Sequence, residues 1–145
     1  MDRASFAELV EATRAAHPIW FDLPSDAKAD AEALRQAQRR LGIQLPDDYA
    51  WFLSEYGGGD FAFAAIYSAD ESSRVYLVDV QPLDGGADTL AFSDNGCGDL
   101  YVFPVENGVA ADIVWIHDHE TGERARDDSD GFLDWVARHA LRPGA

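Results

Sequence analysis

The sequence predicts a single α+β domain in which N-terminal helices precede a central, mostly antiparallel sheet and a C-terminal helix closes the fold. Apolar residues repeat with helical spacing before residue 57 and again near the C-terminus, whereas aromatic and β-branched segments alternate with short glycine-containing turns in between. The chain has 145 residues, and 47% of them are hydrophobic, which is enough for the core of one domain. Since no repeat or low-complexity segment divides residues 1–145, we expect one domain.

Three helices are expected in the N-terminal half. The first runs from a cap at Ser5 to about residue 17, because its apolar residues follow the i, i+3, i+4, i+7 spacing of one helical face. The second begins at a cap on Ser25 or Asp26 and ends at residue 41, before a glycine that suits a helix C-terminus. Prolines bound the apolar residues 19–24 between these helices, so an extended connection packed on the core is expected there.

The third expected helix covers residues 46–56. Its first turn holds Pro46, whose fixed φ suits that position, followed by Asp47 and Asp48, whose charges favour the positive end of the helix dipole. A run of glycines then ends the helix, and the three residues are interpreted as backbone turns that need positive φ.

Strand-forming residues dominate the next part of the chain. The expected strands cover residues 61–67, 74–80, 89–92, 100–103 and 109–117. The turns between them are short, which favours antiparallel pairing. A last helix is expected from a cap at Ser129 or Asp130 to about residue 140, with Phe132, Leu133 and Val136 on its buried face.

The balance of charge excludes two classes of partner. Eleven basic residues against 27 acidic ones give a formal net charge of −16, which repels phosphate backbones and anionic lipid surfaces. We therefore expect neither a nucleic acid nor a membrane as partner, and a basic protein as the partner that this charge attracts. The chain also lacks a long apolar run and a basic, apolar N-terminal leader, so a cytoplasmic location is expected. Its one cysteine, Cys97, is compatible with a reducing compartment.

Two segments resemble a known family. Residues 41–59, LGIQLPDDYAWFLSEYGGG, end one helix, start a second and stop it at the glycines. This pattern resembles the helical hairpin of the SUKH superfamily, the Smi/Knr-like proteins. Residues 93–103, SDNGCGDLYVF, also resemble the family, in which a glycine-containing turn leads into an aromatic strand. The resemblance covers about residues 26–140, and it departs from the family at Tyr56, where relatives commonly have asparagine, and between residues 61 and 88.

The resemblance implies a SUKH-like fold that serves as a binding scaffold without a shared catalytic apparatus. Many members are bacterial immunity proteins that bind and silence a toxin, so the resemblance implies a cognate toxin as partner, such as one that targets nucleic acid, and no cofactor. Acidic residues in loops and turns are the predicted partner-binding residues, since carboxylates complement arginine and lysine. They are Glu55, Asp60, Asp94, Asp99, Asp118 and Glu120. The alternative is a Smi/Knr-like regulatory interaction module.

A metal-dependent enzyme is a more remote alternative. His117 and His119 are two apart, so on a strand they would project from one face, and Asp118 or Glu120 could complete a metal site. No fourth ligand is marked by spacing, and an exposed polar turn explains the same residues. Carboxylate pairs such as Asp94 with Asp99 arise by chance in so acidic a chain, and Cys97 lies between glycines without a basic neighbour.

The four tryptophans are interpreted as core residues. They could anchor a partner, because large aromatic rings dominate interface energies, yet each falls within a segment that needs apolar side chains. They are Trp20, Trp51, Trp115 and Trp135.

Overall fold

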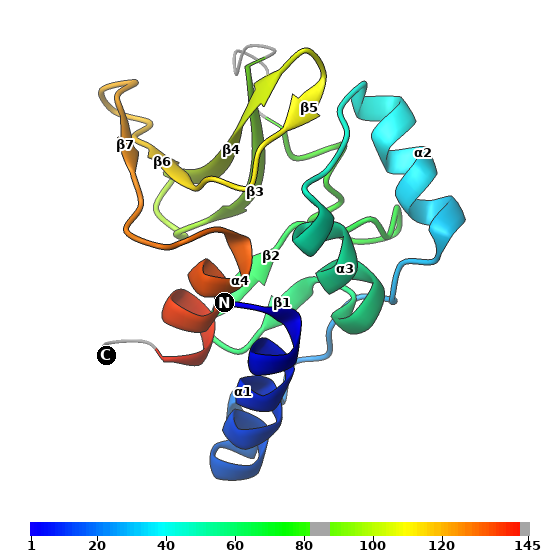
Figure 1. The fold of residues 1–145 in the computed structure, drawn as a ribbon, viewed down its shortest axis with the longest axis vertical. Helices are drawn as coiled ribbons and strands as arrows, with labels where there is room; N and C mark the ends of the chain where they lie inside the picture. Colours follow the sequence, from blue (N-terminus) through cyan, green and yellow to red (C-terminus); the bar gives the residue numbers. More distant parts are fainter. Residues whose placement is uncertain (82–87, 143–145) are drawn as a thin grey trace.

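The computed structural model describes residues 1–81 and 88–142 and confirms the α+β class, with N-terminal helices, an antiparallel sheet and a C-terminal helix (Figure 1). The helical elements are α1 Arg3–Ala16, η1 Pro18–Phe21, α2 Ala31–Leu41, α3 Asp47–Tyr56, α4 Phe132–Val136 and the π-helical turn η2 Ala137–Leu141. The strands are β1 Gly59–Phe61, β2 Ala64–Ile66, β3 Thr89–Asp94, β4 Leu100–Glu106, β5 Val109–Ala110, β6 Trp115–His117 and β7 Arg124–Arg126. No helix in these described ranges is long and apolar enough to cross a membrane.

The described strands form one antiparallel sheet in the order β1-β2-β3-β4-β6-β7, and β5 pairs with the end of β4. The longest pairing joins β3 to β4 and contains a register shift between Ala91 and Ser93. At its first residue, β4 pairs through Leu100 with His117 of β6, and near its last residue it pairs with β5. The two ends of β4 therefore hold different neighbours.

The core lies between the sheet and the helices α3 and α4. Phe92 of β3 stacks on Phe103 of β4 with ring centroids 4.4 Å apart, and Phe132 of α4 meets both rings. Tyr49 of α3 packs on the same cluster and donates its hydroxyl hydrogen to the carbonyl of Tyr67. These aromatic side chains are fully or almost fully buried, so they fix how α3 and α4 sit on the sheet.

Two predicted helix starts are wrong because other residues supply the caps. In α1 the carboxylate of Asp2 accepts the Ser5 N–H at 2.7 Å, so Ser5 lies inside the helix instead of capping it. In α2 the cap is Asp30, whose carboxylate accepts the Ala33 N–H at 2.8 Å. The residues before it run in extended form along α3 and β1, with the Asp26 N–H donating to the carbonyl of Gly58 at 2.9 Å.

The glycine run after α3 makes room for this extended segment. Gly57, Gly58 and Gly59 all have positive φ, as the sequence predicted. A Cβ on Gly57 would lie 2.1 Å from the backbone oxygen of Asp26. Any side chain at residue 57 would therefore separate α3 from the segment that leads into α2.

The start of the last helix also differs from the prediction. The residue before α4 is Gly131, and the carboxylate of Asp112 accepts the Phe132 N–H at 2.7 Å, so neither Ser129 nor Asp130 caps this helix. The predicted buried face is confirmed: Phe132, Leu133 and Val136 are all buried. The local sequence does not reveal this cap, because Asp112 is 20 positions before Phe132 in the chain.

The predicted strand 74–80 is wrong, because that segment forms turns with one isolated bridge between Ser68 and Tyr76. Its Val75 and Leu77 are buried, so the strand-like composition reflects burial and not pairing. The predicted strand 61–67 is divided into β1 and β2 at Ala62, where φ is 51°. The predicted strand 109–117 is divided into β5 and β6, and β7 was not predicted.

The predicted extended connection 19–24 is wrong in its first part, which is the 3-10 helix η1, and two of its apolar side chains face outward, whereas Phe21 packs against Phe61 of the core. Ile19 is 72% exposed and Leu23 is 64% exposed. Of the tryptophans, Trp135 is fully in the core, whereas Trp20, Trp51 and Trp115 are half-buried.

Candidate interaction site

The turn before β4 and the turn after β6 meet at the first end of β4. In the first turn, the side-chain oxygen of Asn95 accepts the N–H groups of Cys97 at 2.9 Å and Asp99 at 3.2 Å. In the second, the carboxylate of Asp118 accepts the Glu120 N–H at 2.8 Å. Both turns are thus closed by their own polar side chains, which explains why asparagine and aspartate concentrate here.

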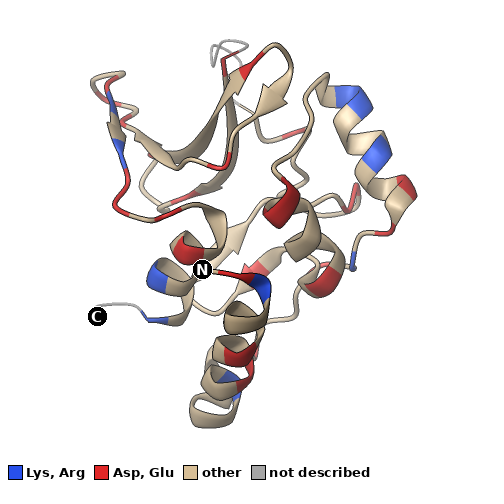
Figure 2. Ribbon diagram, in the orientation of Figure 1, with Lys and Arg blue, Asp and Glu red and all other residues tan. Residues whose placement is uncertain are grey.

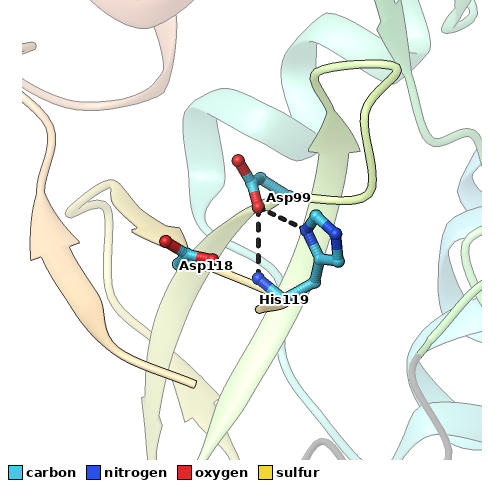
Figure 3. A group of neighbouring side chains, drawn as sticks. All are labelled: Asp99, Asp118 and His119. Carbon is cyan, nitrogen blue, oxygen red and sulfur yellow. Dashed lines mark hydrogen bonds and ion pairs between the residues drawn. The ribbon is translucent and has the colours of Figure 1, made fainter. Parts of the chain in front are cut away.

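Asp99 joins the two turns through His119 (Figure 3). Its Oδ1 accepts the backbone N–H of His119 at 3.1 Å and lies 2.7 Å from Nδ1 of the imidazole. The hydrogen bond from His119 lowers the pKa of Asp99, and the same bond raises the pKa of His119. The φ of Gly98 is +100°, and a Cβ there would lie 3.0 Å from Nδ1 of His119, so this glycine lets the ring approach.

The structure brings four of the six predicted partner-binding residues to this end of the sheet. Asp94 pairs in register with Leu100, beside the turns that hold Asp99, Asp118 and Glu120. The Asp94 carboxylate accepts the Tyr67 hydroxyl and the Gly96 N–H, both at 2.9 Å. The side chain of Glu120 is 79% exposed.

The other two predicted residues lie on α3 and β1. Glu55 is exposed near the end of α3. Asp60 lies in β1, and its carboxylate pairs with Arg74 at 3.1 Å.

The remote alternative in which His117 and His119 project from one face of a strand is not formed, because β6 ends at His117 and the strand alternation stops there. His117 instead accepts a hydrogen bond from Nε of Arg124 at 3.3 Å. Within the described part of the chain, the group that could hold a metal ion is Asp99, Asp118 and His119, whose ligand atoms lie within 4.8 Å of one another. The carboxylates are already engaged in the turns and the imidazole is exposed, so this group resembles a polar turn junction more than a catalytic site.

A different surface forms at the other end of β4. Asn107 and Gly108 both have positive φ, at 53° and 76°, which is the backbone of a tight hairpin turn and brings β5 back along β4. On its other side β5 is held by Gln44, which donates to the carbonyl of Gly108 at 2.7 Å and accepts the Ala110 N–H at 3.0 Å. Val109 is thereby fixed in an exposed position, with 48% of its surface accessible.

Two grooves flank Val109. One has a volume of about 470 Å³, and we call it the acidic groove; it is lined by Arg3, Gln44, Leu45, Pro46, Asp47, Asp48, Val109, Ala110 and Asp112. The other has a volume of about 540 Å³, and we call it the apolar groove; it is lined by Asp88, Pro104, Val105, Glu106, Val109, Ala111, Ile113, Trp115 and Arg124. Because Val109 lines both, the grooves are neighbours on one surface.

Negative charge in the acidic groove is only partly compensated. Arg3 pairs with Asp48 at 2.8 Å and lies 5.4 Å from the ring centroid of Trp51. Asp47 and Asp112 form no ion pair within the residues that the structure describes. Partial burial raises the pKa of Asp112, and the negative charge of Asp48 acts in the same direction. The groove therefore holds more carboxylates than basic groups.

Sequence reasoning missed this surface. It assigned Asp47 and Asp48 to the helix dipole, which the first turn of α3 confirms, and it placed Asp112 in a strand. The signal that could have found it is Asn107-Gly108, which predicts a tight hairpin and hence a projecting residue 109. The groove itself joins the N-terminus, the α2–α3 connection and the segment after β5, which no local pattern links.

Charges are unevenly distributed over the ribbon (Figure 2). Basic residues occur in bands on α2 and on β7, whereas the first turn of α3 is acidic. On α2, Arg35 and Arg39 pair with Glu32, and Arg40 pairs with Glu71. Much of the positive charge is thus neutralised within the molecule.

A protein-family model matches more than half of the chain. The family model SUKH_6, described as SMI1-KNR4 cell-wall, matches residues 31–136. Neither the curated proteins nor the solved structures gave a match. The matched range includes α2, α3, all seven described strands and α4, and so covers both ends of β4.

Proposed function

The chain belongs to the SMI1-KNR4 family, and from that premise we propose that it is an immunity protein that binds a cognate bacterial toxin and occludes its active surface. The mechanism is steric and involves no turnover. The observation that carries the proposal is a net charge of −16 on a chain of this family. Toxins that act on nucleic acids need a positive surface for phosphate, and an acidic protein can compete for that surface.

The six predicted acidic residues serve in this proposal to steer the toxin in the cytoplasm of the protected cell. Exposed carboxylates act over several ångströms and raise the rate of association, while contributing less to the lifetime of the complex. Glu120 and Glu55, which are exposed, are best placed for this role. The other four carboxylates already form ion pairs or hydrogen bonds within the chain, and they add to the negative electrostatic potential of the surface. They belong to Asp60, Asp94, Asp99 and Asp118.

The test is capture of partners from the native cells, at low and at moderate salt, followed by expression of each captured protein in a sensitive host. We expect one protein in equal amount that arrests growth alone and is harmless when the present chain is coexpressed. Toxicity that coexpression leaves unchanged would contradict the proposal.

A regulatory interaction module is the second candidate, because the matching family is described by its connection with the cell wall. Recovery of several unrelated endogenous proteins, none of them toxic, would favour this function over immunity.

A further inference from the structure

We propose that the surface around Val109 anchors the basic partner: a short segment of that partner places an apolar side chain in the apolar groove and an arginine or lysine in the acidic groove. The inference rests on the proposed function for the identity of the partner and goes beyond it in naming the anchoring surface. Contacts at the Val109 end of β4 then set the lifetime of the complex, whereas the acidic residues at the Asp99–Glu120 end only steer the partner during association.

The apolar groove is suited to a buried side chain. Its walls include Val105, Ile113 and the half-buried ring of Trp115. Val109 forms its edge and is 48% exposed, so covering it removes apolar surface from water. Ile19 is more exposed, at 72%, but it does not line either groove. Val109 therefore differs from Ile19 in that its exposed apolar surface lies at the edge of a groove.

The charge of the adjoining groove decides which occupant fits. Three carboxylates, from Asp47, Asp48 and Asp112, face one guanidinium, from Arg3. A guanidinium or ammonium group would compensate the excess negative charge, whereas a second copy of this chain, at −16, would meet general repulsion. The occupant is accordingly a basic segment of another protein.

The surface is also fixed before binding. β5 is held by β4 on one side and by Gln44 on the other, and the hairpin turn between β4 and β5 has the positive φ angles of a tight turn. A preformed surface loses little conformational freedom on binding, so more of the contact energy contributes to affinity.

The experiment compares two pairs of variants with the protein captured by the wild-type chain. Asp47→Arg and Glu120→Arg make the same change in charge at opposite ends of β4, and each replaces an exposed residue. Val109→Ser and Ile19→Ser remove exposed apolar side chains inside and outside the surface. We expect Asp47→Arg and Val109→Ser to speed dissociation by about tenfold or more, and Ile19→Ser to leave it unchanged. Glu120→Arg should slow association by about threefold or less and leave dissociation unchanged.

A defined probe keeps this inference separate from the proposed function. The peptide acetyl-Arg-Leu-Arg-Trp-amide is titrated into the 15N-labelled chain, with acetyl-Glu-Leu-Glu-Trp-amide as control. We expect the basic peptide alone to shift the amide signals of Gln44, Val109 and Asp112, and Asp47→Arg to abolish those shifts. Signals that move only near Glu120, or no shift at all, would overturn the inference. A toxin complex whose dissociation rate is unchanged by both Asp47→Arg and Val109→Ser would also overturn the inference, although the proposed immunity function would then stand. A wild-type chain that captures no toxin would instead contradict the proposed function.

Discussion

The two ends of β4 hold carboxylates in opposite electrostatic situations. At the start of the strand, the hydrogen bond from His119 lowers the pKa of Asp99. Beyond its last residue, burial and the charge of Asp48 raise the pKa of Asp112. β4 has seven residues, so the ends are roughly 20 Å apart at about 3.3 Å per residue.

The difference shows that the acidic residues of this chain do not share one electrostatic environment. Asp94 and Asp118 each accept backbone hydrogen bonds that close their own turns. Asp47 forms no ion pair in the described ranges, and its carboxylate lies in a groove that already has excess negative charge. What a new cation gains depends on how well each carboxylate is already satisfied.

The two ends of β4 stay apart only if the strand is anchored in the core, and Phe103→Ala tests that anchoring. Phe103 is fully buried in the aromatic cluster, so its loss should lower the free energy of unfolding by about 3–5 kcal/mol. Urea unfolding gives the measurement, with Phe63→Ala as the matched control. Phe63 is 56% exposed, and its replacement should change stability by roughly 0.5 kcal/mol or less. Equal losses from the two variants would mean that β4 is not anchored as described.

Glycine substitutions separate the two ends. Gly108→Ala and Gly96→Ala each place a Cβ at a φ of 76°, which should cost about 1–2 kcal/mol. At Gly108 the Cβ would also lie 3.3 Å from the carbonyl oxygen of Gly42, whereas nothing lies within 4 Å at Gly96. Thermal unfolding should therefore show the larger loss for Gly108→Ala.

Amide spectra should locate each effect. Gly108→Ala should move the signals of Val109 and leave His119 unchanged, while Gly96→Ala should do the reverse. A change that spreads to both ends in either variant would contradict their independence.

Local patterns were enough to predict the helices α1, α3 and α4 and the antiparallel sheet. They worked where one segment determines its own structure, as at Gly42, whose left-handed φ of 67° ends α2. They failed where distant groups decide. Residues 26–30 extend along α3 and do not join α2, because the N–H groups of Asp26 and Ala29 donate to the carbonyls of Gly58 and Leu53.

The candidate site was predictable to a similar degree. The turn at residues 94–99 follows from its aspartate, asparagine and glycine residues, and the structure forms it. The approach of His119 to Asp99, which lies 20 positions earlier in the chain, depends on the pairing of β4 with β6. The acidic groove joins three separate segments and the apolar groove also draws on Asp88 and Arg124, so composition alone could not reveal either groove.

The acidic groove can be examined through the titration of Asp112. Because its pKa is raised in the folded state, the protonated form favours folding, and stability is lost as pH rises through its titration. Asp112→Asn keeps an oxygen acceptor for the Phe132 N–H but cannot ionise. The variant should therefore gain stability relative to wild type as pH rises through that range, measured by thermal unfolding at a series of pH values. Asp48→Asn should lower the pKa of Asp112 in a carboxyl NMR titration, and an unchanged value would contradict coupling within the groove.

The smallest effect is expected at the Asp99–His119 pair, which is exposed. The raised pKa of His119 contributes stability that is present below its unfolded pKa and lost as pH rises through the folded value. The lowered pKa of Asp99 contributes stability that is present above its unfolded pKa and lost as pH falls through the folded value. The ion pair is therefore complete in mildly acidic solution, between the two titrations.

Asp99→Asn should lower the pKa of His119 in an imidazole NMR titration. Glu120→Gln should lower it less, because the Glu120 carboxylate is 3.9 Å from Nε2 of His119. The reverse order would show that the turn junction is held by its outer carboxylate, and Glu120 would then be no freer to meet a partner than Asp99.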